Sequence, residues 1–383
     1  SKLKTILVEQ GTSLGGMTAV GMCIVNVNPN FQSGIWTEFR RHINNFYKTT
    51  PGYDTSRNDI LRFEPHTGSA ILKKITDTVK NLSVKLNAPV IAIKKDGTGW
   101  DVTVTINKET VTIKAKVVID ATETAGIATM ASAKFDAGID SSAETKLYRT
   151  GIAVADSPPF PAFSIPLKAI VVKDLENFLV TEKALSFIGT TNLAVQMTLG
   201  QGAGATAAFL AFFKTTTKNL NVRIIQGEIL DHKGYIFPVT DISFSDPYFR
   251  SVQQVCATGL LKGVQKVDGD HPVVIFEPDS AVYTQDIQPV LTELYTRTFL
   301  WFNKVKPGAK FTVGNLLSFI SEITLNDPEN LQLTMQKTWK TTYKFKSDFD
   351  LNRPVTRYEF AALANKFLNP FARTVDLAGK VVN

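Results

Sequence analysis

The hydrophobic period changes within the first 120 residues, and this change limits the possible fold more than any other feature. Ile6-Leu7-Val8 and Val117-Val118-Ile119 are short, uninterrupted apolar runs, which are typical of strands buried in a parallel sheet. Residues 90–115 instead alternate apolar and polar side chains, as antiparallel strands with one exposed face do. The sequence therefore predicts an α/β fold in which a parallel sheet is combined with a three-stranded antiparallel meander.

Turn and helix signals divide the rest of the N-terminal region. Asp96-Gly97 and Asn107-Lys108 provide the two turns of the meander. Apolar residues at helical spacing predict a helix over 35–47, and Pro65 predicts the start of another that runs to about Leu82. Residues 151–168 are rich in proline and are expected to form a connector.

A glycine- and alanine-rich run at 200–208 leads into a hydrophobic helix that is predicted to reach about Phe213. Polar residues at 215–219 interrupt the pattern, so we place a domain boundary there. Residues 1–218 are expected to form the α/β domain, and residues 219–383 a mainly α-helical C-terminal domain.

The C-terminal region contains a weak internal repeat with an offset of 73 residues. Each copy is a turn that leads into an amphipathic helix, which indicates two copies of one supersecondary unit at about 237–301 and 310–371. The matching positions are Phe276/Phe349, Val282/Val355, Ile287/Phe360, Val290/Leu363 and Leu294/Phe367.

Composition excludes several classes of protein. The net charge of +7 comes from 42 Lys+Arg against 35 Asp+Glu and is spread thinly, which argues against nucleic-acid binding. The two cysteines lack CxxC spacing and the four histidines lack HExxH spacing, so no metal site is expected. No run of about 18 apolar residues is present, so no membrane span is expected.

Three segments could carry cofactor chemistry. Glu9 ends the first apolar strand, as does the acidic residue that holds the ribose hydroxyls in a dinucleotide-binding unit; the alternative is a solvated strand-end carboxylate. The glycines at 15–16 could bring backbone amides close to phosphates, or form an ordinary turn. The glycines at 200–204 could place a helix N-terminus beside a cofactor, or allow close packing of a helix on a sheet.

Taken together, these segments resemble the FAD-dependent oxidoreductases with two dinucleotide-binding domains, in particular the exported branch typical of Bacteroidetes. The resemblance covers about residues 3–215 and implies an FAD/NAD-binding Rossmann-like fold. It is carried, in chain order, by a strand ending in Glu9, the GGMTA loop, the FEP-led helix, the meander, VVIDAT, IPLKAI…NFLV and GQGAGATAA. The tail, with Phe237-Pro238-Val239-Thr240-Asp241 and Pro354-Val355-Thr356-Arg357, resembles degenerate S-layer-homology repeats.

The resemblance implies that FAD is the cofactor. Glu9 would hold the adenosine ribose, and Val90 would contribute backbone contacts near the adenine. The helix that begins near Gly200 would lie at the flavin ring. The full set of implied cofactor-binding positions is Glu9, Gly15, Gly16, Met17, Thr18, Val90, Asp120, Ala121, Thr122, Gly200, Gly202, Ala203 and Gly204.

The sequence also departs from the family pattern. It contains no GxGxxG turn, so the first strand–turn–helix unit of the domain is expected to be missing, and the chain, which begins with Ser1, is expected to be trimmed or processed. Gly126 occupies a position where the family commonly has an acidic residue, and Asn192 one where it often has arginine. No His or Tyr pair presents itself as a catalytic base.

The leading hypothesis is an FAD-dependent oxidoreductase that acts on a small organic or carbohydrate-derived substrate. The alternative is a cofactor-less flavoprotein-like subunit that serves binding or structure, with protein partners or in a cell-surface assembly. The family branch implies a periplasmic or cell-surface location, although the sequence shows no signal peptide.

Overall fold

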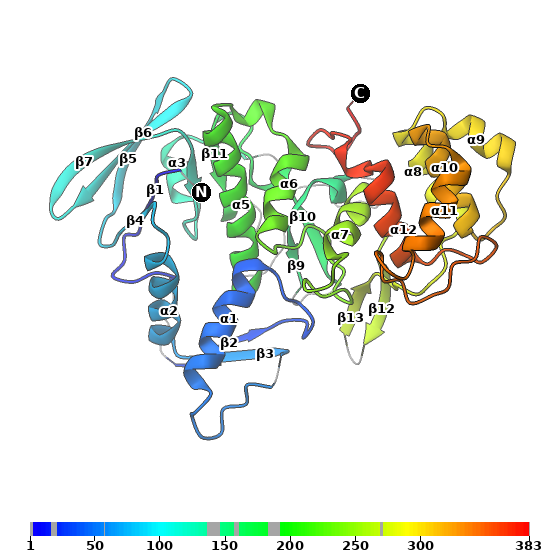
Figure 1. Ribbon diagram of the computed structural model, residues 1–383. Coiled ribbons are helices and arrows are strands. Elements are labelled where there is room, and N and C mark those ends of the chain that lie inside the picture. Colours follow the sequence, from blue (N-terminus) through cyan, green and yellow to red (C-terminus); the bar gives the residue numbers. More distant parts are fainter. Residues whose placement is uncertain are drawn as a thin grey trace. The chain divides into compact units, whose positions relative to one another are not determined.

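The computed structural model describes residues 3–16, 21–56, 58–135, 146–156, 161–182, 192–268 and 271–382 (Figure 1). The chain divides into two compact units, Ser1–Ile236 and Phe237–Asn383. The first unit therefore extends beyond the expected boundary at 218/219. No helix in the described ranges is long and apolar enough to cross a membrane.

The first unit combines helices with several small sheets. β1 pairs with β4 and β8 with β11, both in parallel; β2–β3, β9–β10 and β5-β6-β7 are antiparallel. The elements are β1 (Thr5–Val8), β2 (Cys23–Asn26), α1 (Gly34–Tyr47), β3 (Ile60–Phe63), α2 (Pro65–Asp77), β4 (Leu82–Lys85), β5 (Val90–Asp96), β6 (Gly99–Ile106), β7 (Glu109–Ala115), β8 (Val118–Asp120), α3 (Gly126–Met130), η1 (Leu147–Thr150), β9 (Gly151–Ala155), β10 (Phe163–Pro166), η2 (Leu167–Ile170), β11 (Phe178–Val180), α5 (Leu193–Phe213), η3 (Thr217–Asn219) and α6 (Val222–Asp231).

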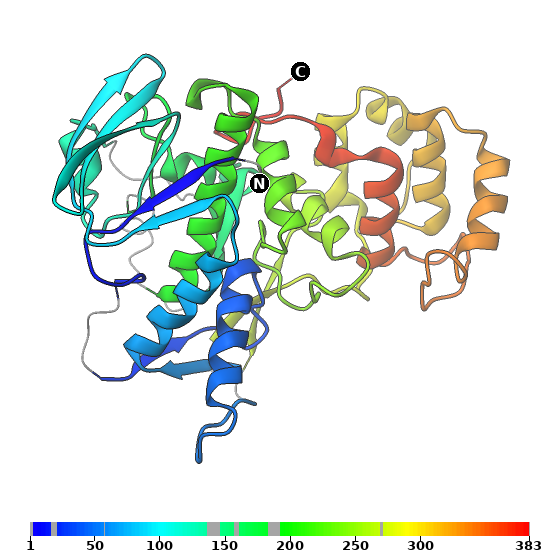
Figure 2. The ribbon, with the colours of Figure 1, turned by 60° about the vertical axis from the view of Figure 1, so that its left-hand side comes forward.

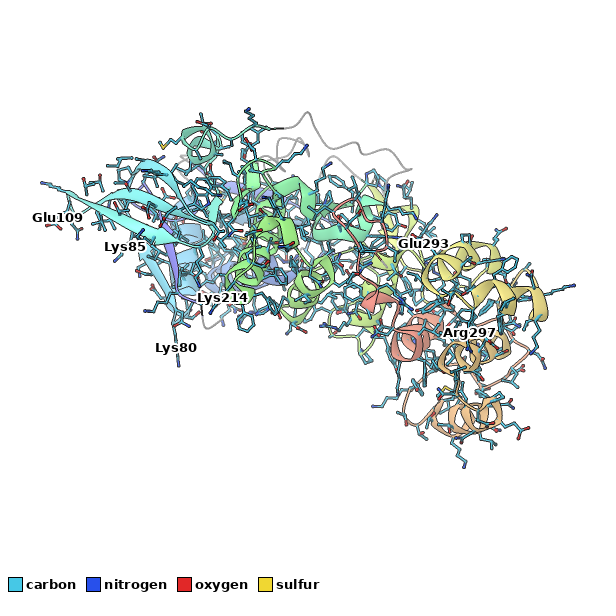
Figure 3. The ribbon with its side chains drawn as sticks, turned by 90° about the horizontal axis from the view of Figure 1, so that it is seen from above. Lys80, Lys85, Glu109, Lys214, Glu293 and Arg297 are labelled. Carbon is cyan, nitrogen blue, oxygen red and sulfur yellow. The ribbon has the colours of Figure 1, made fainter. Side chains whose placement is uncertain are left out.

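The predicted meander is confirmed as β5-β6-β7. Its second turn uses Asn107 and Lys108 with φ of 52° and 68°, the left-handed pair that a tight hairpin between twisted strands requires. Glu109 follows this turn at the end of the hairpin (Figure 3). The alternation also places Trp100 on the covered face, where its ring meets Phe178 at 5.1 Å.

The two parallel strands form as predicted, but the expectation that they are buried is wrong. Ile6 in β1 is 46% exposed and Ile119 in β8 is 37% exposed. In the described part of the chain, each of these strands has one pairing partner only. A strand in a two-stranded pair lacks the cover that a wide sheet with helices on both faces provides.

The two helices predicted before the meander begin as expected, and the second of them ends early. α1 buries Trp36, Phe39 and Ile43 completely, as its apolar spacing requires. α2 begins at Pro65 but ends at Asp77, and the residues from Leu82 form strand β4 instead. Figure 2 shows β4 beside β1, so the residues from the predicted end of this helix onward supply the parallel partner of the first strand.

The proline-rich connector contains an antiparallel strand pair, β9 and β10, which the sequence did not predict. β9 is buried throughout because helix α5 packs on it. The packing is so close that a Cβ at Gly202 would lie 2.5 Å from the carbonyl oxygen of Ile152. Gly202 therefore permits the contact of α5 with β9, which is the packing alternative considered for this glycine run.

The second unit is mainly helical, with one hairpin. Its elements are α7 (Phe249–Thr258), β12 (Val264–Asp268), β13 (His271–Ile275), α8 (Thr284–Leu294), α9 (Thr298–Val305), α10 (Val313–Thr324), α11 (Pro328–Thr338), α12 (Arg357–Leu363), the π-helix η4 (Ala364–Leu368) and η5 (Pro370–Ala372).

Three short segments of this unit meet where its helices begin. Val282 N donates to Val355 O, Val355 N to Phe311 O, and Phe311 N to Val282 O, at 2.9–3.0 Å. Each segment leads into a helix: α8, α10 or α12. The 73-residue repeat related only the outer two, and the structure adds the middle one, whose helix has a capping box like that of α12.

Candidate functional site

Glu9 lies where the sequence predicted, immediately after β1. Its backbone N–H donates to Lys85 O at 2.8 Å, which continues the parallel pairing with β4. One carboxylate oxygen, Oε1, accepts the N–H of Gly11 at 2.6 Å. Among the described residues, Oε2 receives no hydrogen bond, and the side chain is half-buried. Glu9 thus keeps one carboxylate oxygen that accepts no hydrogen bond from the described residues.

The glycine loop is described in part. Gly15 and Gly16 have φ of 99° and 59°, a backbone conformation that suits glycine far better than other residues. A Cβ at Gly16 would meet nothing within 4 Å, so its backbone is open on that side. Met17 and Thr18 lie outside the described residues.

Val90 begins β5 and lies close to Glu9 along the backbone network. Ala88 N donates to Glu9 O at 2.9 Å, so the segment that leads into β5 is tied to the end of β1. The register of β5 with β6 shifts between Val90 and Ala92. A shift of this kind leaves backbone groups outside the ladder, which suits the adenine-side contacts that the resemblance implies for Val90.

Asp120 ends β8 and is 1% exposed. Its Oδ1 accepts both the N–H and the hydroxyl of Thr122, at 2.9 and 2.7 Å, and Oδ2 accepts Ala128 N at 2.7 Å. The Thr122 hydroxyl in turn accepts Gly126 N at 2.8 Å. The carboxylate of Asp120 therefore holds the turn into α3, in which Ala121, Glu123 and Thr124 are exposed.

The long helix α5 does not begin at Gly200, so this part of the prediction is wrong. It begins at Leu193, where the Asn192 side chain accepts Ala194 N at 2.9 Å as an N-cap. Asn192 is a strong capping residue, and this signal was available in the sequence. Gly200 and Gly204 lie inside the helix with open space around them, and Ala203 is buried.

The structure brings the predicted residues together in two groups. Glu9 and Val90 are joined through Ala88. The turn at Asp120–Thr122 is near α5, because β8 contacts that helix. The N-terminal end of α5 also reaches the end of β2, where Asn192 Nδ2 donates to Asn26 O at 2.8 Å. This end, rather than the glycine run, carries the unpaired N–H groups and the positive end of the helix dipole.

The sequence analysis missed Asp156, which follows β9 and is 1% exposed. Among the described residues no hydrogen bond of normal geometry reaches either carboxyl oxygen, although the Asn28 side chain is close enough to interact as a donor. Burial raises the pKa of this carboxyl to about 7, while the nearby Asn28 side chain lowers it. Asp156 precedes Pro158 and Pro159, and this proline-rich sequence predicted a connector rather than a buried strand end.

Comparison with known proteins gives one family match, in the N-terminal part of the chain. Residues 1–154 match the family described as FAD dependent oxidoreductase. No curated protein matches the chain. Among solved structures, p-nitrophenol 4-monooxygenase PnpA from Pseudomonas putida DLL-E4 aligns at 13% identity with a TM-score of 0.24. The alignment covers 36% of this chain and 39% of that one.

Proposed function

We propose that the first unit binds FAD and oxidises or reduces a small organic or carbohydrate-derived substrate. The observation that carries this proposal is the carboxylate of Glu9, at the end of a parallel strand, with one oxygen left for a ribose hydroxyl. The family match over residues 1–154 supports the same class of cofactor.

The residues present fit such a cofactor. Glu9 Oε2 would accept a ribose hydroxyl, and the open backbone at Gly16 would approach the pyrophosphate. The N-terminal end of α5 would favour negative charge on the ring system. When bound, FAD supplies a hydride acceptor.

Titration of the purified chain with FAD tests the proposal directly. We expect the flavin absorbance to shift on binding, and Glu9→Gln to weaken binding about tenfold, which corresponds to about 1.4 kcal/mol. Glu109→Gln is the matched control, because Glu109 is an exposed carboxylate on the meander turn. Absence of FAD binding by the wild-type chain would refute the proposal.

One observation favours the cofactor-less alternative. Ala125 precedes α3 in a left-handed conformation, with φ 52° and ψ 41°, and Gly126 follows it where the resemblance calls for an acidic residue. A turn built in this way has one acidic contact fewer to offer a cofactor. If the FAD titration fails, a binding or structural subunit with protein partners is the function that remains.

The proposal extends to the second unit, as an S-layer-homology-like module of an exported, Bacteroidetes-type protein located in the periplasm or at the cell surface. Its support is the set of three similar helix starts and a groove of about 350 Å³ between α11 and η4. Threonine and asparagine side chains line the groove together with Tyr343 and Lys366. Co-sedimentation with purified cell walls tests it: we expect binding by the full chain and at least a fivefold loss in Lys366→Ala, and equal binding by both proteins or by neither overturns it.

A further inference from the structure

Three buried polar side chains meet in the first unit outside the predicted cofactor positions. Asn28 follows β2, Asp156 follows β9 and Tyr235 follows α6; they are 5%, 1% and 1% exposed. Asn28 N donates to Asp156 O at 3.4 Å. Tyr235 N donates to Ser33 Oγ at 3.0 Å, and its ring meets Phe31 at 5.8 Å. The loop between β2 and α1 thus contacts both other members.

Hydrogen bonds do not explain why the Asp156 carboxyl is buried. Both of its oxygens are buried, and within the described ranges neither receives a hydrogen bond of normal geometry, whereas buried carboxylates in folded proteins are normally paired or hydrogen-bonded. Asn28 lies near enough to lower the pKa of Asp156, but its own Oδ1 accepts Asn30 N at 2.9 Å. Tyr235 is the titratable group whose phenol interacts electrostatically with the carboxyl. An uncompensated carboxyl at a strand end is a candidate for proton chemistry.

The cluster lies at the N-terminal end of α5. Thr198 Oγ1 donates to Val154 O at 3.2 Å, which fixes β9 two residues before Asp156. Asn192 Nδ2 donates to Asn26 O, which fixes β2 two residues before Asn28. Both strand ends are therefore attached to the first two turns of the helix whose N-terminus, in the proposed function, faces the flavin.

We infer that Asp156 is the proton acceptor of the oxidation carried out by this unit. In the step, the C–H bond of an alcohol-type substrate breaks and its hydride, with both electrons, passes to the oxidised flavin. The O–H bond breaks as a C=O bond forms, and the proton goes to an Oδ of Asp156, which becomes a neutral carboxylic acid. The α5 N-terminus would stabilise negative charge on a reduced flavin bound beside it. This inference rests on the proposed function, because the flavin is the hydride acceptor.

The assignment predicts that flavin reduction and Asp156 protonation are linked. With dithionite as the reductant, we expect the wild-type protein to take up as much as one proton more on reduction at pH 8, where the carboxyl is mostly ionised in the oxidised protein, than Asp156→Asn does. The measurement is the midpoint potential of bound FAD against pH, and Asp77→Asn, an exposed aspartate on α2, is the matched control. We expect the control to follow the wild type.

Carboxyl NMR of the full chain labelled with ¹³C-aspartate gives a second measurement. We expect one signal, missing in Asp156→Asn, to titrate near pH 7 in the oxidised protein and at higher pH in the reduced protein. Tyr235→Phe is the second variant, and we expect this titration to stay near pH 7, because the phenol, whose pKa burial raises above its ordinary value, is uncharged there. A signal that titrates near pH 4 overturns the inference.

The two proposals fail in different ways. If the wild-type chain takes up no FAD, the proposed function is wrong and this inference with it. If FAD binds to the wild type and to Asp156→Asn equally and both show the same dependence of potential on pH, the inference alone is wrong.

Discussion

Two strand ends of the first unit each present a buried aspartate, and the two carboxyls are treated in opposite ways. Asp120 ends β8 and Asp156 follows β9, and each is 1% exposed. The Asp120 carboxylate accepts three hydrogen bonds from the turn that it holds, while the Asp156 carboxyl accepts none of normal geometry from the part of the chain that the structure describes. Equal burial therefore does not imply an equal role: hydrogen bonds make the first carboxylate a structural element, and their absence leaves the second able to bind a proton.

The largest expected effect is the pH dependence of stability that Asp156 causes. Its pKa is about 7 in the folded protein against an ordinary value of 3.8, so the folded state binds the proton more tightly than the unfolded state does. Stability falls as pH rises from about 4 to above 7, by about 4 kcal/mol for this group. Denaturant unfolding at several pH values measures it, and Asp156→Asn should remove this part of the slope. A variant with the wild-type slope would contradict the prediction.

Asp120→Asn should show the opposite behaviour. The amide places N–H groups where the carboxylate accepts bonds, so Ala128 N or the Thr122 donors lose their partner. We expect a loss of about 3 kcal/mol at pH 7, measured by urea unfolding. Asp156→Asn is the control, and at pH 8 we expect it to be more stable than the wild type. Equal effects of the two substitutions would remove the distinction between the carboxyls.

Thr122→Val tests the hydrogen-bond network around Asp120 by changing a partner of the carboxylate instead of the carboxylate itself. The hydroxyl both donates to Asp120 Oδ1 and accepts Gly126 N, so its removal leaves a backbone N–H and part of a carboxylate unsatisfied. We expect a loss of about 1.5 kcal/mol in the free energy of unfolding. Thr124→Val, at an exposed position of the same turn, should change it by less than about 0.5 kcal/mol. A loss as large in Thr124→Val would show that the turn is sensitive as a whole.

The smallest effect concerns the backbone of the same turn. Ala125 has φ 52° and ψ 41°, a left-handed conformation that costs alanine more than glycine. We expect Ala125→Gly to stabilise the first unit by about 0.5 kcal/mol, with part of the gain lost because glycine is freer in the unfolded chain. The midpoint of thermal unfolding measures it. A lower midpoint would mean that the buried Ala125 methyl group contributes more through packing than its conformation costs.

Local features were predictable and long-range ones were not. The turn at Asn107-Lys108 and the start of α2 at Pro65 depend on near neighbours, and both form as predicted. The glycine run predicted a start of α5 at Gly200, whereas the helix begins after the capping residue Asn192. Strand pattern and charge predicted the place of Glu9 at the end of the first strand. Asp156 was missed because its neighbours in the sequence do not indicate that it is buried.

The sequence by itself determined the strand and helix periods, the meander and the position of Glu9, because these follow from side chains a few residues apart. Tertiary structure alone decided that Ile6 stays exposed, that β9 is buried under α5, and that the Asp156 carboxyl is buried near Asn28 and Tyr235 without a well-formed hydrogen bond from the described residues. The physical reason is that burial and the satisfaction of a carboxylate depend on segments far apart in the chain, and periodicity carries no information about which of them meet.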